Sequence, residues 1–443
     1  MNTFVIALIL FAATYVLLFA LPKYRAYVAL ASAVIFTVWL SFIAGDVEFT
    51  PLDSLLGIDF NVLMMITGTM GIVTLFIESK MPMLIADVML SKFKSVKTAI
   101  VAMAALSGIV SAFVDNVATV LMIAPIALAV CKKQNMSPVF PIIAIAVSSN
   151  LQGAATLVGD TTSILLGGHL DMTFFDFFVF RGKPGIFWAV ELGAFLTLLI
   201  LLWIFRKENA PLTLSDRTVV KDYVPSFLMG GVIVLLILAS FLKAPAGGFW
   251  LGIYNHRNGI ICISLLLTGI IINLVRNKSF DSLKLVLKEM DYQTILLLAS
   301  LFVVINGISS AGVIDRLAKG LASIGGSNLF LMYTIIVFAS VAVSAFVDNI
   351  PYTLTMLPVV ESVAREMGNL DYQIVLCFGL LIGATLGGNI TPIGASANIT
   401  GIGILRKEGY EVKAADFMKV SVPFTLTAVL SGYLFIWLFW GIL

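Results

Sequence analysis

One hexapeptide occurs twice in this chain, at positions about half its length apart. The sequence SAFVDN occupies Ser111 to Asn116 and again Ser344 to Asn349, an offset of 344 − 111 = 233 in a chain of 443 residues. Both copies place an aspartate and an asparagine within long apolar stretches. Acids within a membrane are expensive and usually functional. The repeat therefore predicts two halves that each bring a polar turn to one shared site.

The composition places the chain in a membrane. Hydrophobic residues make up 60% of the sequence and charged residues 12%, whereas soluble domains contain about 25% charged residues. Apolar stretches of about 20 residues, the length that crosses a bilayer, recur along the whole chain. We expect crossings at residues 3–21, 26–44, 60–77, 139–168, 185–204, 224–242, 258–275, 291–308, 374–404 and 420–442.

Loop charges predict how the chain is oriented in the membrane. Lys23 and Arg25 follow the first apolar stretch, and basic residues concentrate in cytoplasmic loops. The N-terminus is therefore expected outside, and an even number of crossings also places the C-terminus outside. These features predict a multi-pass protein of the plasma (inner) membrane.

The two copies of SAFVDN lie in segments that are not expected to cross. Residues 98–131 are flanked by lysines on both sides, so both ends favour the cytoplasm. Residues 329–361 are followed by a flank with net negative charge, which suits the outer side. Each segment is interpreted as a re-entrant hairpin with its acid and amide at the tip, a geometry tolerated only where protein or water surrounds it.

The likeness between the halves extends beyond the hexapeptide. Thr156 to Gly159 reads TLVG and Thr391 to Gly394 reads TPIG, at an offset of 235. Each half is predicted to contain five crossings and one hairpin, and an odd number of crossings inverts the second half relative to the first. The predicted fold is an all-α integral membrane protein with two inverted repeats, at residues 1–205 and 224–443. The polar stretch 206–223 is predicted to be a cytoplasmic linker.

Each hairpin is followed by a crossing that carries glycine, proline, hydroxyl and amide residues at mid-depth, which predicts a broken helix. Unwound carbonyls and polar side chains can coordinate a cation, and the half-helix that follows can hold an anion. The candidate substrate and ion ligands are Asp115, Asn116, Asn150, Thr156, Gly159, Asp160, Thr161, Ser163, Asp348, Asn349, Asn389, Thr391, Gly394, Ser396 and Asn398. The candidate ligands of a sodium ion are Asp115, Asn116, Asp348 and Asn349. The proposed site contains three acids and no lysine or arginine.

The motifs FVDNVATVLMIAP and SNLQGAATLVGD resemble those of the ion transporter superfamily. Within this superfamily, the motifs are similar to those of arsenite permeases, bacterial sodium/proton antiporters and citrate-type permeases. They are more distantly similar to those of divalent-anion/sodium symporters. The resemblance covers nearly the whole chain and implies an elevator mechanism with a scaffold that often forms a homodimer. Asp115-Asn116-Val117 and Asp348-Asn349-Ile350 occupy the positions of the symporters' Ser-Asn-Thr tips. The family's Asp-Pro-Pro-Asn is Asp160-Thr161-Thr162-Ser163 here.

These observations predict an ion-coupled secondary active transporter for a small solute. The expected solute is an inorganic or organic anion, citrate-like, dicarboxylate-like or arsenite-like, moved with or against H⁺ or Na⁺. Sodium/proton exchange without a further solute is the alternative, and an ion channel is the alternative of another class. No enzyme, nucleic-acid partner or cofactor other than a coupling ion is expected. Both histidines lie outside the predicted site, and three scattered cysteines do not suggest a metal site.

Overall fold

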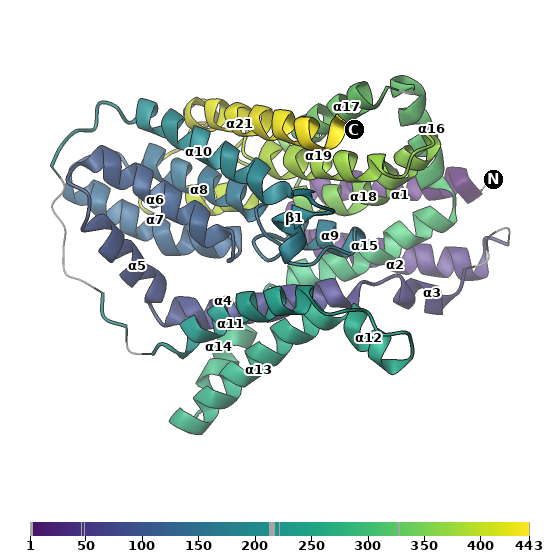
Figure 1. Ribbon diagram of the computed structural model, residues 1–443, viewed down its shortest axis with the longest axis horizontal. Helices are drawn as coiled ribbons and strands as arrows, with labels where there is room; N and C mark the ends of the chain where they lie inside the picture. The colour runs from purple at the N-terminus through teal and green to yellow at the C-terminus, as the bar shows by residue number, and fades with distance from the viewer. Residues whose placement is uncertain are drawn as a thin grey trace.

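The computed structural model describes residues 3–45, 47, 49–211, 218–220, 222–326 and 328–442. Residues 212–217 and 221 of the predicted linker lie outside this described part. The described chain folds into helices, with one short antiparallel ribbon (Figure 1). The elements of the first half are α1 (Thr3–Ala20), η1 (Pro22–Tyr24), α2 (Arg25–Phe42), α3 (Pro51–Leu56), α4 (Phe60–Glu78), α5 (Met81–Leu90), α6 (Val96–Ser111), α7 (Asn116–Lys133), α8 (Val139–Gly153), α9 (Thr161–His169), η2 (Phe175–Phe177), β1 (Val179–Phe180), β2 (Lys183–Pro184) and α10 (Ile186–Ile204).

The second half contains helices only within its described residues. Its elements are α11 (Val224–Ser240), α12 (Phe249–Asn255), α13 (Arg257–Asn277), α14 (Asp281–Glu289), α15 (Tyr292–Ser310), α16 (Val313–Gly325), α17 (Leu329–Ser344), α18 (Asn349–Glu366), α19 (Tyr372–Gly387), α20 (Ser396–Lys407), α21 (Ala414–Ile436) and the π-helical turn η3 (Trp437–Gly441). The short helices α5, α14 and α16 lie in regions where no crossing was predicted.

Eight helices in the described part are long and apolar enough to cross a bilayer, so the chain is a multi-pass membrane protein. The crossings expected at 139–168 and 374–404 were predicted to be broken helices. In the structure each is a pair of helices separated by a break, α8 with α9 and α19 with α20. The predicted crossing 224–242 is the shorter helix α11, with 17 residues. Helix α7 is long enough to span, yet it forms one arm of a helix–turn–helix with α6.

Each helix–turn–helix packs against the broken helix that follows it. Helices α6 and α7 contact α8, and α17 and α18 contact α19. Helices α10 and α21 lie side by side over this assembly, as Figure 1 shows at its upper edge. The pairs α4 with α13 and α2 with α15 make further extensive contacts.

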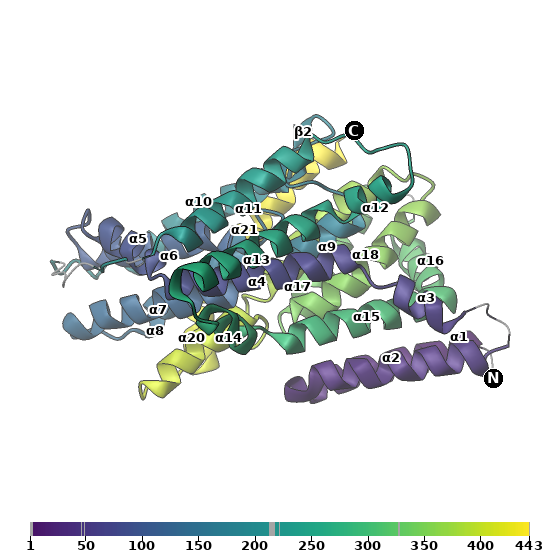
Figure 2. The same cartoon turned by 90° about the horizontal axis from the view of Figure 1, so that it is seen from below.

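Helices α1 and α2 lie along one edge of the molecule (Figure 2). With α15 and α16 they enclose a second hydrophobic cluster, which includes Phe36, Trp39 and Val304. The main core is a larger cluster that contains residues of α6 to α10 and α17 to α21, and also residues of α2, α15 and α16. The second cluster is therefore a smaller packing unit at this edge, formed by helices that also contribute to the main core.

The two helix–turn–helix units have their open ends at opposite ends of the molecule. The start of α6 lies beside the residues after α10, with Val96 N donating to Ala210 O at 3.0 Å. The end of α7 lies beside the end of α20, where Lys132 pairs with Glu408 at 2.5 Å. The end of α18 lies elsewhere, beside the last residue of α9, with His169 and Glu361 3.2 Å apart. The two tips therefore approach the middle of the molecule from opposite directions (Figure 1).

Candidate functional site

Both tips have the same local structure, because an aspartate caps the second helix of each unit. The Asp115 carboxylate accepts hydrogen bonds from Val117 N at 2.9 Å and Ala118 N at 3.1 Å. The Asp348 carboxylate accepts one from Ile350 N at 3.1 Å. An aspartate at this position satisfies amides that begin a helix and have no partner within it. The repeated Asp-Asn pair thus fixes where α7 and α18 begin.

The two breaks are held against the backbone of the tips. A Cβ atom on Gly159 would lie 2.9 Å from the carbonyl oxygens of Ser111 and Ala112. A Cβ atom on Gly394 would lie 2.8 Å from the carbonyls of Ser344 and Ala345 in the second unit. Only glycine allows so close an approach of two backbones.

Threonines reinforce this contact in both halves. The Thr156 hydroxyl donates to the carbonyl of Ala112, and the Thr391 hydroxyl donates to the carbonyl of Ala345. Both threonines therefore hold backbone together.

Asparagines join the two halves across the centre of the molecule. Asn150 of α8 donates to the carbonyl of Thr385 in α19 at 2.8 Å. Asn389, two residues after the end of α19, donates to the carbonyl of Val147 in α8 at 2.9 Å. At the first tip, Asn116 donates to Asn150 Oδ1 at 3.2 Å and accepts from Ser111 at 2.6 Å. The centre is thus a connected polar network.

A cavity of about 430 Å³ opens beside this network, a volume in the range of small-molecule sites. The first residues of four helices line it: Asn116 of α7, Thr161 of α9, Asn349 of α18 and Ser396 of α20. Helix N-termini carry partial positive charge and free amide donors. Both tips and both breaks therefore present helix N-termini to one cavity.

The four N-termini differ in how they are capped. Asp115, Asp160 and Asp348 accept hydrogen bonds from the first amides of α7, α9 and α18. The cap of α20 is Ala395, whose side chain cannot accept a hydrogen bond. The amides that begin α20 are therefore not satisfied by a cap, and Ser396 and Ala397 line the cavity.

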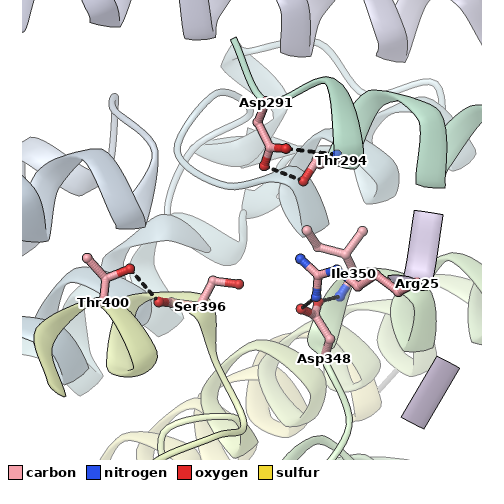
Figure 3. A network of polar contacts seen from close by, with 7 residues as sticks. All are labelled: Arg25, Asp291, Thr294, Asp348, Ile350, Ser396 and Thr400. Atoms are coloured by element: carbon pink, nitrogen blue, oxygen red, sulfur yellow. Dashed lines mark hydrogen bonds and ion pairs between the residues drawn. The ribbon is translucent and has the colours of Figure 1, made fainter. Parts of the chain in front are cut away.

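Carboxylates dominate the charge around the cavity. Asp115 and Asp160 line it, together with Glu78 of α4, Glu289 of α14 and Asp291 before α15. Asp291 also caps α15, accepting from Thr294 N at 3.0 Å and from its hydroxyl at 2.6 Å (Figure 3). A bare anion entering this cavity would meet net repulsion unless cations accompany it.

The expectation that the site contains no basic residue is wrong. Arg25, the first residue of α2, lines the cavity and forms an ion pair with the Asp348 carboxylate (Figure 3). It is 323 residues away in sequence and was interpreted only as a loop charge that sets orientation. Tyr15 of α1 also donates to Pro351 O of α18 at 2.8 Å. The second tip is thus tied to α1 and α2, whereas Asp115 at the first tip lines the open cavity.

The predicted site residues fall into two groups. Those that line the cavity are Asp115, Asn116, Asn150, Asp160, Thr161, Asn349 and Ser396. Those that support it from behind, mostly through contacts to backbone carbonyls, are Thr156, Gly159, Ser163, Asp348, Asn389, Thr391, Gly394 and Asn398. Of the candidate sodium ligands, Asp348 is the one that already has a positively charged partner.

Sequence patterns alone did not identify several residues of the cavity. Glu78, Glu289 and Asp291 stand at helix ends, where acids are ordinary. The only sequence feature that marks these three residues is an acid at the edge of an apolar stretch. That feature is the same for a residue that lines a cavity and for one that lies at the membrane surface.

Comparisons with known proteins agree with this architecture. A sequence-family model described as "Citrate transporter" matches residues 6–378. An uncharacterized transporter of Mycobacterium tuberculosis is 27% identical over 442 residues, covering 98% of each chain. The solved YdaH transporter of Alcanivorax borkumensis superposes with a TM-score of 0.60 at 15% identity, over 93% of this chain and 96% of that one. Neisseria gonorrhoeae MtrF, whose structure is described in connection with a class of antimetabolite efflux pumps, superposes with a TM-score of 0.57 at 13% identity. The match covers 100% of this chain and 96% of MtrF.

Proposed function

Because the chain belongs to the citrate transporter family, and is therefore a membrane transporter and not an enzyme, we propose that it carries a small carboxylate anion together with cations. The anion is bound at the N-terminus of α20 and the cations at Asp115 and Asp160. A gradient of H⁺ or Na⁺ drives the movement.

The observation that carries this proposal is the meeting of four helix N-termini at one cavity, three capped by aspartate and one capped by alanine. The α20 N-terminus offers amide donors without a competing carboxylate, which is the chemistry that binds an anion. Asp115 and Asp160 offer carboxylate oxygens on the same cavity, which suit a cation or a proton. The two kinds of ligand then neutralise each other in a region where isolated charges are costly.

Alternating access between the two sides of the membrane is the proposed mechanism. Two units with the same local structure approach the cavity from opposite directions, which supports an inverted repeat. The smaller hydrophobic cluster formed mainly by α1, α2, α15 and α16 is the proposed scaffold against which the central helices move. Arg25 of α2 pairs with Asp348 at the second tip, and the proposed movement changes this contact.

Sodium/proton exchange without a further solute would need the carboxylates alone. The α20 N-terminus favours the anion transporter over this alternative, because an exchanger has no use for free amide donors at its ion site.

Uptake into proteoliposomes tests the proposal. Purified protein is reconstituted, and a panel of labelled citrate, dicarboxylates and inorganic oxyanions is offered under imposed Na⁺ or pH gradients. We expect saturable accumulation of at least one carboxylate that collapses when the gradient is dissipated. Gradient-dependent cation exchange without uptake of any anion would favour the sodium/proton exchanger. Single-channel currents would favour a channel.

A further inference from the structure

A second polar group lies within the apolar helices, away from the central cavity. Glu191 is in the first half of α10, and its carboxylate accepts a hydrogen bond from Gln152 Nε2 of α8 at 3.2 Å. A separate cavity of about 170 Å³ between α6, α8 and α10 is lined by both residues. Acids within a bundle are expensive, and most have a functional role.

The hydrogen bonding of this pair is incomplete. Gln152 is 6% exposed, and its Oε1 atom is buried without a hydrogen-bond donor. Ser148, one turn earlier on α8, lines the same cavity, and its hydroxyl is also buried without a partner. A Cβ atom on Gly108 of α6 would lie 2.9 Å from Gln152 Cγ, so α6 packs closely against this side chain.

The Gln152 Oε1 atom lacks a donor that a protonated Glu191 would supply. An ionised carboxylate only accepts hydrogen bonds, whereas a protonated carboxyl group can also donate one. A primary amide and a protonated carboxyl group can therefore exchange two hydrogen bonds, N–H···O and O–H···O. The structure has the first of these, and a single proton on Glu191 would supply the donor for the second.

We propose that Glu191 and Gln152 form a proton-binding site. A proton from water forms an O–H bond on the Glu191 carboxylate, removes its charge and donates to Gln152 Oε1. Gln152 lies directly before Gly153, the last residue of α8, and two residues after Asn150, which contacts the first tip and α19. Protonation thus acts at the helix whose break forms the central site.

No other ionisable residue lines this cavity among the described residues. The other lining residues from α6 and α8 are Ala104, Ala105, Gly108, Ile109, Ser148 and Leu151. Helix α21 packs on α10 with Ala428 and Ser431 at Gly193. Its acid Asp416 and base Lys419 are at its first turns and pair with each other at 2.7 Å. A proton that binds here therefore binds to Glu191.

Infrared spectroscopy of the full-length protein in lipid tests proton binding directly. The carbonyl band of a protonated carboxyl group is followed as pH falls, in wild type, in Glu191→Gln and in the control Glu408→Gln at the exposed end of α20. We expect one hydrogen-bonded carboxyl band to be lost in Glu191→Gln and retained in the control. In Gln152→Leu the band should remain but shift to the frequency of a carboxyl group without this partner. An unchanged band pattern in Glu191→Gln would overturn the proposal.

The role of this proton in transport rests on the proposed function and is tested separately. Accumulation driven by a pH gradient is compared with solute counterflow, which needs no net proton movement, in the same liposomes. Accumulation should be lost in Glu191→Gln by a larger factor than counterflow, and both should persist in Glu408→Gln. Because an amide can still bond to Gln152, a purely structural tie predicts normal accumulation in Glu191→Gln, which would overturn the coupling role. If wild type transports no solute, the proposed function fails, while the infrared result still decides whether Glu191 binds a proton.

Discussion

The two helix breaks share a backbone geometry but differ in charge. A Cβ atom would lie 2.9 Å from the tip carbonyls if added to Gly159 and 2.8 Å from them if added to Gly394. Thr156 and Thr391 make equivalent hydrogen bonds. The residue after the glycine differs, because Asp160 caps α9 with its carboxylate, whereas the cap of α20 is Ala395, whose side chain cannot accept a hydrogen bond. The comparison indicates that repeated backbone contacts position the site, while one unmatched residue determines which charge each break accepts.

The largest effect is expected from making the two breaks alike in charge. Ala395→Asp places a carboxylate on the amides that begin α20, where the proposed anion binds. Like charges brought together in a desolvated site cost several kcal/mol, which corresponds to a loss of uptake of about a hundredfold or more. The neutral cap Ala395→Asn is the matched control and should retain more uptake than Ala395→Asp. Equal uptake by the two variants would show that no anion binds at this helix.

Alanine at either glycine tests whether the breaks are equivalent in structure. The added Cβ atom of Gly159→Ala or Gly394→Ala would lie less than 3 Å from backbone oxygens. Overpacking of this kind costs about 1–3 kcal/mol, so both variants should melt at lower temperature by similar amounts in the same detergent. Gly403→Ala, at a position with open space around it, is the control. Clearly unequal melting temperatures of Gly159→Ala and Gly394→Ala would show that the two breaks are not equivalent in structure.

Removing the charge of the first break should weaken cation binding without uncapping α9. Asp160→Asn keeps an oxygen that can accept from Thr161 N, and asparagine is as good a cap as aspartate. Loss of one charged hydrogen-bonding or ion-binding group is worth about 1–3 kcal/mol, or about a tenfold to hundredfold rise in the half-saturating cation concentration. Uptake is measured against Na⁺ and H⁺ concentration, with melting temperature as the measure of folding. An unaltered cation dependence would remove Asp160 from the cation site.

The smallest effect is expected at the ion pair that distinguishes the tips. Arg25→Gln removes the positive charge beside Asp348, in a pair whose side chains are 26% and 18% exposed. A partly exposed pair of this kind is worth about 1 kcal/mol, so the balance between the two transport positions should shift about fivefold. Spin labels on α2 and α18 measure this shift as a change in the distance distribution.

Arg257→Gln is the matched control for that measurement. Arg257 begins α13 as Arg25 begins α2, at an offset of 257 − 25 = 232. Its guanidinium group lies over the Tyr254 ring, 4.0 Å from the centroid, and does not line the central cavity. A distance shift of equal size and direction in both variants would show that the Arg25 pair does not hold this position.

The residues that local rules govern were predictable from the sequence. The Asp-Asn pairs were placed at turns between helices, and Asp115 and Asp348 occupy the caps of α7 and α18. Gly159 and Gly394 were assigned to breaks in the crossings and lie in them. Their role against the tip backbone was not predicted, because which backbone lies opposite a glycine depends on packing between helices.

Sequence alone determined that this chain lies in a membrane and contains two equivalent polar turns and two broken helices. Hydropathy over about 20 residues and the capping of a helix are local properties, so no partner is needed to infer them. Only the tertiary structure decided that Arg25 meets Asp348, that Glu191 meets Gln152, and that Thr156 and Thr391 face backbone while Asn349 and Ser396 face the cavity. The physical reason is that a buried polar side chain takes its role from the group on the neighbouring helix, and that helix can lie hundreds of residues away.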